Sequence, residues 1–234
     1  MTKREIRVAL AGSSACEGFG NSDPRLIAGW GEVIGNYFRK HVKILNFARS
    51  GYSTKKFIND GFWQKTLDSK PDYILLGLGV NDIRSEPEFH TEPEEYRGNL
   101  MRFLKETRDI GAIPVFITLN LELCYDAENN KAVFNHGKAF TPVREPYSRV
   151  MREVAAAEHV PCIDLARLQQ EALETMGEDA AGKLYRVTDL KTMKVDPSHT
   201  NRKGAELIAE LIANGIAGSD SPLKHELAVS VKKI

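Results

Sequence analysis

Short apolar segments alternate along the chain with longer segments in which apolar and polar residues mix. The short segments have the length of β-strands and are bounded by turn-forming residues. Three of them contain almost no polar residue, which is typical of strands covered on both faces of a sheet. The pattern therefore predicts five strands, at residues 6–11, 42–47, 73–78, 113–119 and 161–165.

The longer segments carry apolar residues at helical spacing. Residues 92–110, for example, place Tyr96 and Leu100 on one face of a helix. The run Thr91–Glu92–Pro93–Glu94 at its start has the form of a capping box with an early proline. The pattern predicts four helices, at residues 24–40, 92–110, 144–159 and 201–217.

Strands joined by long helical crossovers form a parallel sheet with helices on both faces. We therefore expect three layers, α/β/α, around a mainly five-stranded parallel sheet. Residues 120–143 are polar and should form a long loop at the carboxyl edge of that sheet. Residues 218–234 should form an added edge strand or a docked tail, because Leu227, Val229 and Val231 alternate weakly with polar residues.

Composition and charge narrow the class of protein. The 234 residues are 42% hydrophobic and 27% charged, which suits one α/β domain over residues 1–234 with its core at about 6–217. Thirty-two Lys and Arg balance 32 Asp and Glu. A net charge of zero argues against broad binding to nucleic acid or to an anionic membrane.

Neither the cysteines nor the amino terminus changes this interpretation. The three cysteines, Cys16, Cys124 and Cys162, form no CxxC motif, so we expect no disulfide framework and no structural zinc, and we place the last two in the core. No apolar run approaches the ~18–20 residues of a membrane-spanning helix. The basic amino terminus precedes an apolar stretch too short for a signal peptide, so the expected location is cytoplasmic unless a signal was removed.

Four short polar motifs follow or flank the apolar segments, where ligands of parallel α/β folds bind. Each one alone has a common structural explanation, such as a turn or a helix cap, and Asp82 is expected to cap the segment that follows it. Together they should meet at one edge of the sheet. The motifs are Gly12-Ser13-Ser14-Ala15, Ala48-Arg49-Ser50-Gly51, Gly79-Val80-Asn81-Asp82 and Asp196-Pro197-Ser198-His199.

These residue types suit acyl transfer. A serine of the Gly12–Ala15 turn can act as the nucleophile if a base removes its proton, and His199 can be that base. Asp196, three residues earlier, can orient the imidazole. The Gly51 N–H and the Asn81 amide are the kinds of donor that stabilise an oxyanion.

The order of Ser, Gly, Asn and His in these contexts resembles the SGNH hydrolase superfamily, also called GDSL-type esterases. Gly79-Val80-Asn81-Asp82 and Asp196-Pro197-Ser198-His199 are the strongest matches, and the resemblance spans roughly residues 6–215. Ala28-Gly29-Trp30-Gly31, Ala48-Arg49-Ser50-Gly51 and the run 196–201 are most similar to the rhamnogalacturonan acetylesterase-like group.

The resemblance implies a flavodoxin-like α/β/α fold and an esterase that removes acetyl or other short acyl groups from a carbohydrate. It implies that Ser14 is the nucleophile and that Asp196 and His199 complete the triad. The Ser14 N–H, the Gly51 N–H and Asn81 would form the oxyanion hole. We expect neither a cofactor nor a metal, because the sequence shows no cluster of metal ligands. The expected binding partner is a small-molecule or oligosaccharide ester.

Two positions depart from the family pattern, and alternatives stay open. Ser13 stands where the family usually has aspartate, and Val80 stands where many acetylesterases have histidine. One alternative keeps the triad but changes the substrate to a lipid ester, an aryl ester or a thioester. Another is a binding module with a degraded site. A nucleotide-binding domain is disfavoured, because residues 12–20 lack the glycine and lysine spacing of a phosphate loop.

Overall fold

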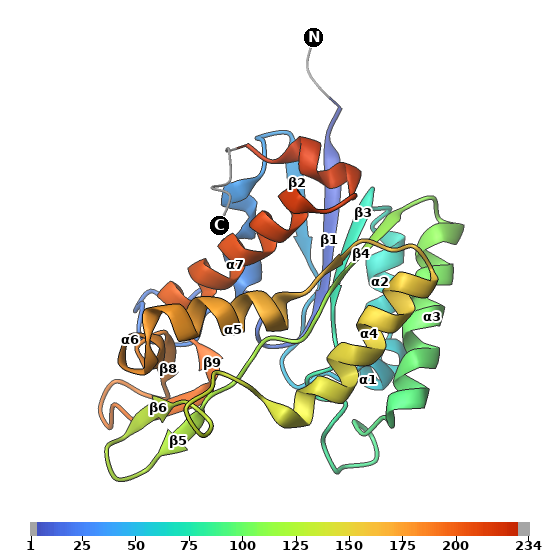
Figure 1. Ribbon diagram of the computed structural model, residues 1–234. Coiled ribbons are helices and arrows are strands. Elements are labelled where there is room, and N and C mark those ends of the chain that lie inside the picture. The colour runs from blue at the N-terminus through green and yellow to red at the C-terminus, as the bar shows by residue number, and fades with distance from the viewer. Residues whose placement is uncertain (1–3, 229–234) are drawn as a thin grey trace.

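The computed structural model describes residues 4–228 and has a five-stranded parallel sheet at its centre (Figure 1). The sheet order is β2-β1-β3-β4-β7, which is the 2-1-3-4-5 order of flavodoxin-like folds. All five strands lie where the sequence predicts them, so the predicted fold class is confirmed. They are β1 Ile6–Gly12, β2 Val42–Asn46, β3 Tyr73–Gly77, β4 Ile113–Ile117 and β7 Cys162–Ile163.

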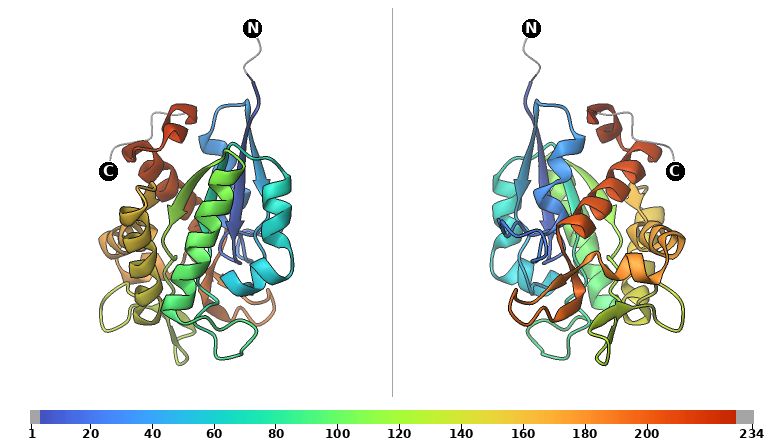
Figure 2. Two further views of the ribbon diagram at one scale, coloured as in Figure 1. Left: turned by 90° about the vertical axis from the view of Figure 1, so that its right-hand side faces the viewer. Right: turned by 90° about the vertical axis from the view of Figure 1, so that its left-hand side faces the viewer.

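Both faces of the sheet are buried because successive side chains of a strand point to opposite sides. In β1, Val8 and Leu10 enter one core cluster, whereas Ala9 and Ala11 enter another. The first face is covered by the α-helices α5 (Leu165–Met176) and α7 (Arg202–Gly218), together with two 3-10 helices, η1 and η2, within residues 30–37. The second face is covered by α1 (Thr54–Asn59), α2 (Phe62–Asp68), α3 (Pro93–Asp109) and α4 (Glu145–Ala157), and Figure 2 shows the two layers from either side.

Three of the four predicted helices are confirmed as α3, α4 and α7, with ends within a few residues. The prediction of a capping box at the start of α3 is wrong. The N-cap of α3 is Glu92, and its side chain makes no capping hydrogen bond. The Thr91 hydroxyl instead donates to Asp82 Oδ1 over 2.7 Å. By contrast, the Asn201 side chain caps α7 and accepts from the Gly204 N–H.

The helix predicted at residues 24–40 is wrong. Only two 3-10 helices form there, η1 (Trp30–Glu32) and η2 (Ile34–Tyr37). The reason is close packing of the backbone, because a Cβ on Gly29 would lie 2.2 Å from the Glu17 carbonyl oxygen. The Trp30 N–H also donates to the Ala15 carbonyl at 2.8 Å, so it serves the neighbouring turn rather than an α-helix.

The long loop expected at residues 120–143 contains a hairpin, formed by β5 (Cys124–Asp126) and β6 (Lys131–Val133). A second hairpin, β8 (Tyr185–Val187) and β9 (Val195–Thr200), and the short α6 (Glu178–Gly182) were not predicted. Both hairpins lie beyond the carboxyl ends of the parallel strands (Figure 1). The expected position of residues 120–143 is therefore right, although their expected conformation is not.

The carboxyl-terminal segment docks on the body of the protein. It forms a 3-10 helix, η4 (Pro222–Glu226), and the buried Leu227 bridges to Phe38. This corresponds to the docked tail of the two alternatives, while Val229 and Val231 lie outside the described residues.

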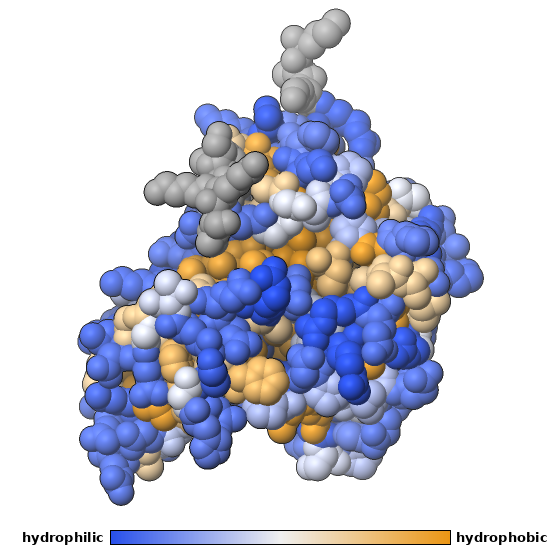
Figure 3. Space-filling model, viewed as in Figure 1, coloured by the Kyte–Doolittle hydropathy of each residue, from blue (hydrophilic) through white to orange (hydrophobic). Residues whose placement is uncertain are grey.

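The core position expected for Cys124 is wrong, because this residue is exposed, whereas Cys162 is partly buried and packs against the second core cluster. Within residues 4–228, no helix is both long and apolar enough to cross a membrane. The face shown in Figure 3 is mainly hydrophilic, with an apolar band across the region of α5 and α7. Partly buried side chains of these two helices that pack against the core include Leu168, Ala172 and Leu207.

Candidate active site

The turn after β1 presents Ser14 and buries Ser13. The Ser13 carbonyl accepts the N–H groups of Cys16 and Glu17 at 2.9 and 3.0 Å, which closes a tight turn. Ser13 is 2% exposed, whereas Ser14 is half-buried and lines a cavity. Of the two adjacent serines, Ser14 is therefore the one that a substrate can reach.

A bulge in the β8–β9 hairpin carries His199 toward that turn. Arg186 is paired with Asp196, and its neighbour Tyr185 is paired with Thr200, so residues 197–199 are extra residues on β9. Such bulges bend a strand and change the direction of its side chains. The extra residues direct the His199 imidazole away from the hairpin and toward Ser14.

The structure brings Ser14, His199 and Asp196 together in one chain of contacts. The Ser14 Oγ lies 3.0 Å from His199 Nε2, and His199 Nδ1 lies 2.9 Å from Asp196 Oδ2. Burial alone would raise the pKa of Asp196, but hydrogen bonds from His199, the Ser198 N–H and Arg186 reverse this effect and hold the pKa well below its usual range.

The low pKa of Asp196 assigns the protons in this chain of contacts. A carboxylate can only accept hydrogen bonds, so His199 Nδ1 carries the hydrogen that faces Asp196. In the neutral imidazole, Nε2 is then free to accept the Ser14 hydroxyl proton. This is the tautomer that a serine nucleophile requires.

Gly51 and Asn81, two of the three residues predicted for the oxyanion hole, lie in two linked loops. The Asn81 side chain lines the same cavity as Ser14, and one of its N–H groups donates to the Tyr52 carbonyl at 3.1 Å. Tyr52 directly follows Gly51, whose φ of +78° lies in the left-handed region that favours glycine. Gly51 is not among the residues that line the cavity, but the Asn81–Tyr52 bond ties its turn to the cavity wall.

Asp82 anchors the loop that carries Asn81. Its buried carboxylate accepts the N–H and the hydroxyl of Thr54, at the start of α1, as well as the hydroxyl of Thr91. Burial raises the pKa of Asp82 in spite of these bonds. The expectation that Asp82 caps the segment after it is wrong, because its carboxylate binds the N–H and the hydroxyl of Thr54 at the start of α1, a helix that precedes it in the chain and whose N-cap is Ser53.

The cavity around Ser14 has a volume of about 240 Å³ and one strongly polar wall. Glu122 binds the buried Arg144 at 2.5 Å and accepts the Ser198 hydroxyl at 3.2 Å. Burial lowers the pKa of Arg144. Asn120 and Arg84 add further polar groups, whereas Ala15, Val80 and Ile83 are apolar.

Sequence reasoning missed most of this polar wall. No local motif marks Glu122 or Arg144, and only their contacts in the folded chain bring them to Ser198. The Ala28-Gly29-Trp30-Gly31 run, which resembles the acetylesterase-like group, has a structural role. Gly29 and Gly31 pack against the backbone of residues 16–17 and so support the turn that carries Ser14.

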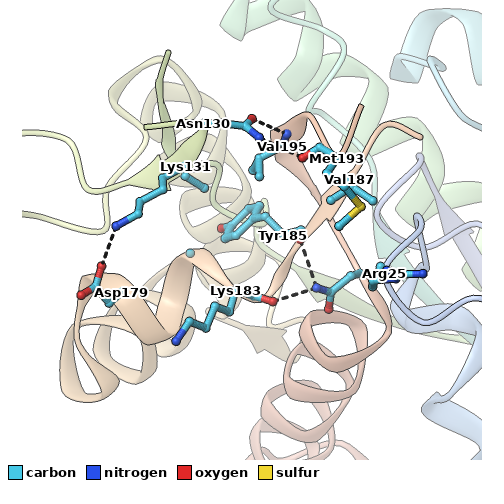
Figure 4. A pocket seen from close by; sticks show the side chains of 12 residues that line it. Arg25, Asn130, Lys131, Asp179, Lys183, Tyr185, Val187, Met193 and Val195 are labelled. Carbon is cyan, nitrogen blue, oxygen red and sulfur yellow. Dashed lines mark hydrogen bonds and ion pairs between the residues drawn. The ribbon is translucent and has the colours of Figure 1, made fainter. Parts of the chain in front are cut away.

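A second cavity, of about 470 Å³, lies on the other side of the β8–β9 hairpin (Figure 4). Because side chains alternate along a strand, Tyr185, Val187 and Val195 line this cavity while Arg186 and Asp196 do not. The Asn201 side chain, which also lines it, donates to the carbonyls of Lys183 and Tyr185. None of the predicted catalytic residues belongs to this larger cavity.

Two curated proteins are similar to this chain over nearly its full length. Over 224 residues the chain is 30% identical to the probable rhamnogalacturonan acetylesterase YesY of Bacillus subtilis (strain 168), covering 94% of this chain and 96% of that protein. Over 236 residues it is also 30% identical to the rhamnogalacturonan acetylesterase RhgT of the same organism, covering 97% and 96%. The resemblance expected from the sequence is thereby confirmed.

A solved structure shares the fold, and a family model matches the sequence. The crystal structure of protein YxiM from Bacillus subtilis aligns with a TM-score of 0.75 at 22% identity, over 97% of this chain and 58% of that longer chain. Residues 10–207 match the GDSL-like lipase/acylhydrolase family. The chain therefore belongs to this family, whose members are carboxylic ester hydrolases.

Proposed function

We propose that this protein is a serine esterase that removes acetyl groups from a carbohydrate, with Ser14, His199 and Asp196 as its catalytic triad. The observation that supports this most strongly is the position of the His199 imidazole, 3.0 Å from Ser14 Oγ and 2.9 Å from Asp196 Oδ2. Residues from the two ends of the chain meet there in hydrogen-bond contact.

In the first half of the reaction, Ser14 Oγ attacks the carbonyl carbon of the ester while its proton passes to His199 Nε2. The carbonyl oxygen becomes an oxyanion, which the N–H groups of Ser14 and Gly51 and the Asn81 amide stabilise. The imidazolium then donates its proton to the leaving alcohol oxygen. An acyl-serine remains on the enzyme.

In the second half, water takes the place of the alcohol. His199 removes a proton from the water as its oxygen attacks the acyl carbon, and the same donors stabilise the second oxyanion. The intermediate expels Ser14 Oγ, which recovers its proton from His199. The carboxylic acid leaves and the enzyme returns to its starting state.

The composition of the cavity supports a polar alcohol and a small acyl group. Its volume of about 240 Å³ is small for a ligand site, and Asn120, Glu122 and Arg144 offer hydrogen bonds to hydroxyl groups. The two relatives at 30% identity are named rhamnogalacturonan acetylesterases. An acetylated sugar is therefore the substrate class that we propose, within one catalytic domain.

The proposal predicts that the parent enzyme hydrolyses p-nitrophenyl acetate and acetylated oligosaccharides. Ser14→Ala should lower kcat by about 10⁴-fold or more, because no other group replaces the nucleophile. Ser13→Ala is the matched control and should retain most of the activity. Near-parental turnover in Ser14→Ala would remove this residue from the mechanism, and a preference for long-chain esters over acetates would reject the substrate class.

A further inference from the structure

Arg186 forms an ion pair with the triad carboxylate. Its Nε lies 2.7 Å from Asp196 Oδ2, the oxygen that also faces His199 Nδ1 at 2.9 Å. The other carboxylate oxygen, Oδ1, accepts the Ser198 N–H at 2.8 Å. The three donors come from two strands, and the side chains of Asp196 and Arg186 are only 15% and 25% exposed.

The hairpin fixes this contact. Arg186 in β8 is the register partner of Asp196 in β9, on the face opposite to the second cavity. Directly opposed residues on one face of an antiparallel pair have Cβ atoms about 4.5–5.5 Å apart, which is close enough for an ion pair. The backbone pairing that creates the His199 bulge thus also places the guanidinium beside the aspartate.

We propose that Arg186 is a positioning residue of the triad, which holds Asp196 in place and makes the His199 imidazole harder to protonate. This inference rests on the proposed function. A guanidinium that donates to the same oxygen as the imidazole withdraws part of the negative charge that would stabilise an imidazolium. Its own positive charge acts in the same direction. The enzyme should therefore remain active at lower pH than it would with the Asp196–His199 pair alone.

The other charged groups around His199 do not replace Arg186. Glu122 reaches the bulge only through the Ser198 hydroxyl, and it is neutralised by its own ion pair with Arg144. Arg84 lines the cavity but pairs with Glu86. Among the described residues, Arg186 is the cation that contacts the triad carboxylate directly.

The test is the pH dependence of kcat/KM for p-nitrophenyl acetate in Arg186→Gln and Arg186→Lys. Glutamine removes the charge, so the fall of kcat/KM on the acidic side of the profile should shift to higher pH by about 0.5–1 pH unit, with little change in KM. Lysine keeps the charge but not the planar Nε–H donor. In Arg186→Lys, the acidic side of the profile should stay within about 0.2 pH unit of the parent, while the kcat on the plateau should fall several-fold. Arg25→Gln is the matched control, because the Arg25 side chain pairs with Asp23 and not with a triad residue, and it should behave like the parent.

An acid limb in Arg186→Gln that coincides with the parent's would overturn the role of Arg186. If Arg186→Gln does not fold, Arg186→Met is the second neutral variant, with the same expected shift. If neither neutral variant folds, Arg186→Lys becomes the test of the proposal. A kcat of Arg186→Lys equal to that of the parent would then reject the positioning role. Failure of the proposed function is distinguishable, because the parent would then be inactive, or Ser14→Ala would be as active as the parent.

Discussion

At the scale of single residues, accessibility separates two adjacent serines that look equivalent in the sequence. Ser13 is enclosed by its own turn, and Ser14 faces His199. The grouping of Ser14, Asn81 and His199 could be predicted because each follows or flanks an element that ends at one edge of a parallel sheet. Arg186 could not, since its contact with Asp196 depends on the register of a short hairpin that no sequence pattern marks.

Asn81 is predicted to act mainly in the transition state. One of its N–H groups is engaged by the Tyr52 carbonyl, which leaves the second for an oxyanion. Asn81→Ala should therefore lower kcat by ~10²–10³-fold with little change in KM, as measured by steady-state kinetics.

Asn81→Asp separates catalysis from folding. A carboxylate would repel the oxyanion and face the Tyr52 carbonyl, so this variant should be at least as inactive as alanine. If Asn81 only held its turn, aspartate would be tolerated. A stable Asn81→Asp enzyme with parental kcat would exclude Asn81 from the oxyanion hole.

The low pKa of Asp196 predicts the origin of the acid limb of activity. The depressed pKa of Asp196 also affects the free energy of unfolding. The ionised Asp196 stabilises the folded state above its unfolded pKa, and this stabilisation is lost as the pH falls through its folded pKa. Between pH 5 and 8 Asp196 stays ionised, so its own protonation does not limit activity there. If His199 is the base, the rate should rise with pH across this range, because only the neutral imidazole can accept the Ser14 proton. A rate that is flat between pH 5 and 8 would contradict a histidine base.

Substitutions in the Asp196–His199 pair test the same assignment. Asp196→Asn should lower kcat by up to ~10⁴-fold, the effect of losing the correct imidazole tautomer, and His199→Ala should be nearly inactive. Both effects are measured by steady-state kinetics on folded protein, with circular dichroism as the check of folding. Parental kcat in either variant would contradict the triad.

At the scale of elements, the successes and failures of prediction have physical causes. The parallel strands are buried on both faces, so their apolar runs are unmistakable. The sequence did not predict α1, α2, α6 or the hairpins, which are short, or α5, which directly follows a strand. The pattern at residues 24–40 has helical spacing, but its glycines allow the backbone to pack on the Ser14 turn instead. Tertiary contact decided the conformation there.

Gly29 is predicted to be required for the shape of the nucleophile turn. In Gly29→Ala the new Cβ would meet the Glu17 carbonyl oxygen and the backbone of Cys16, which cannot move without displacing the turn. We expect a loss of about 1–3 kcal/mol in the free energy of unfolding and a lower kcat. Urea denaturation and steady-state kinetics measure the two effects.

The matched control is Gly98→Ala in α3, where a Cβ would meet nothing within 4 Å. Removing an exposed glycine from a helix should stabilise the protein by roughly 0.5–1 kcal/mol and leave kcat unchanged. Equal stability changes in the two variants would show that the contact at Gly29 is unimportant.

At the scale of the whole molecule, the catalytic groups come together because the fold brings distant segments to one edge. Ser14 and Asn81 follow β1 and β3, which are adjacent strands whose ends Gly12 and Gly77 are in register. The strand order reverses at this pair, and ligands of such sheets bind at that point. His199 arrives from the opposite end of the chain, on a bulged strand that precedes α7. The fold class and the edge could be predicted from the strand–helix alternation, but the two cavities could not.

The most direct test of the central claim is labelling of the folded protein with a fluorophosphonate, followed by mass spectrometry of its peptides. Ser14 Oγ should displace fluoride and take up the phosphonyl group, giving one label per chain on the peptide that contains Ser14. His199→Ala should abolish the labelling, because the hydroxyl then has no base. A label on any other residue, or no label on active enzyme, would contradict the account.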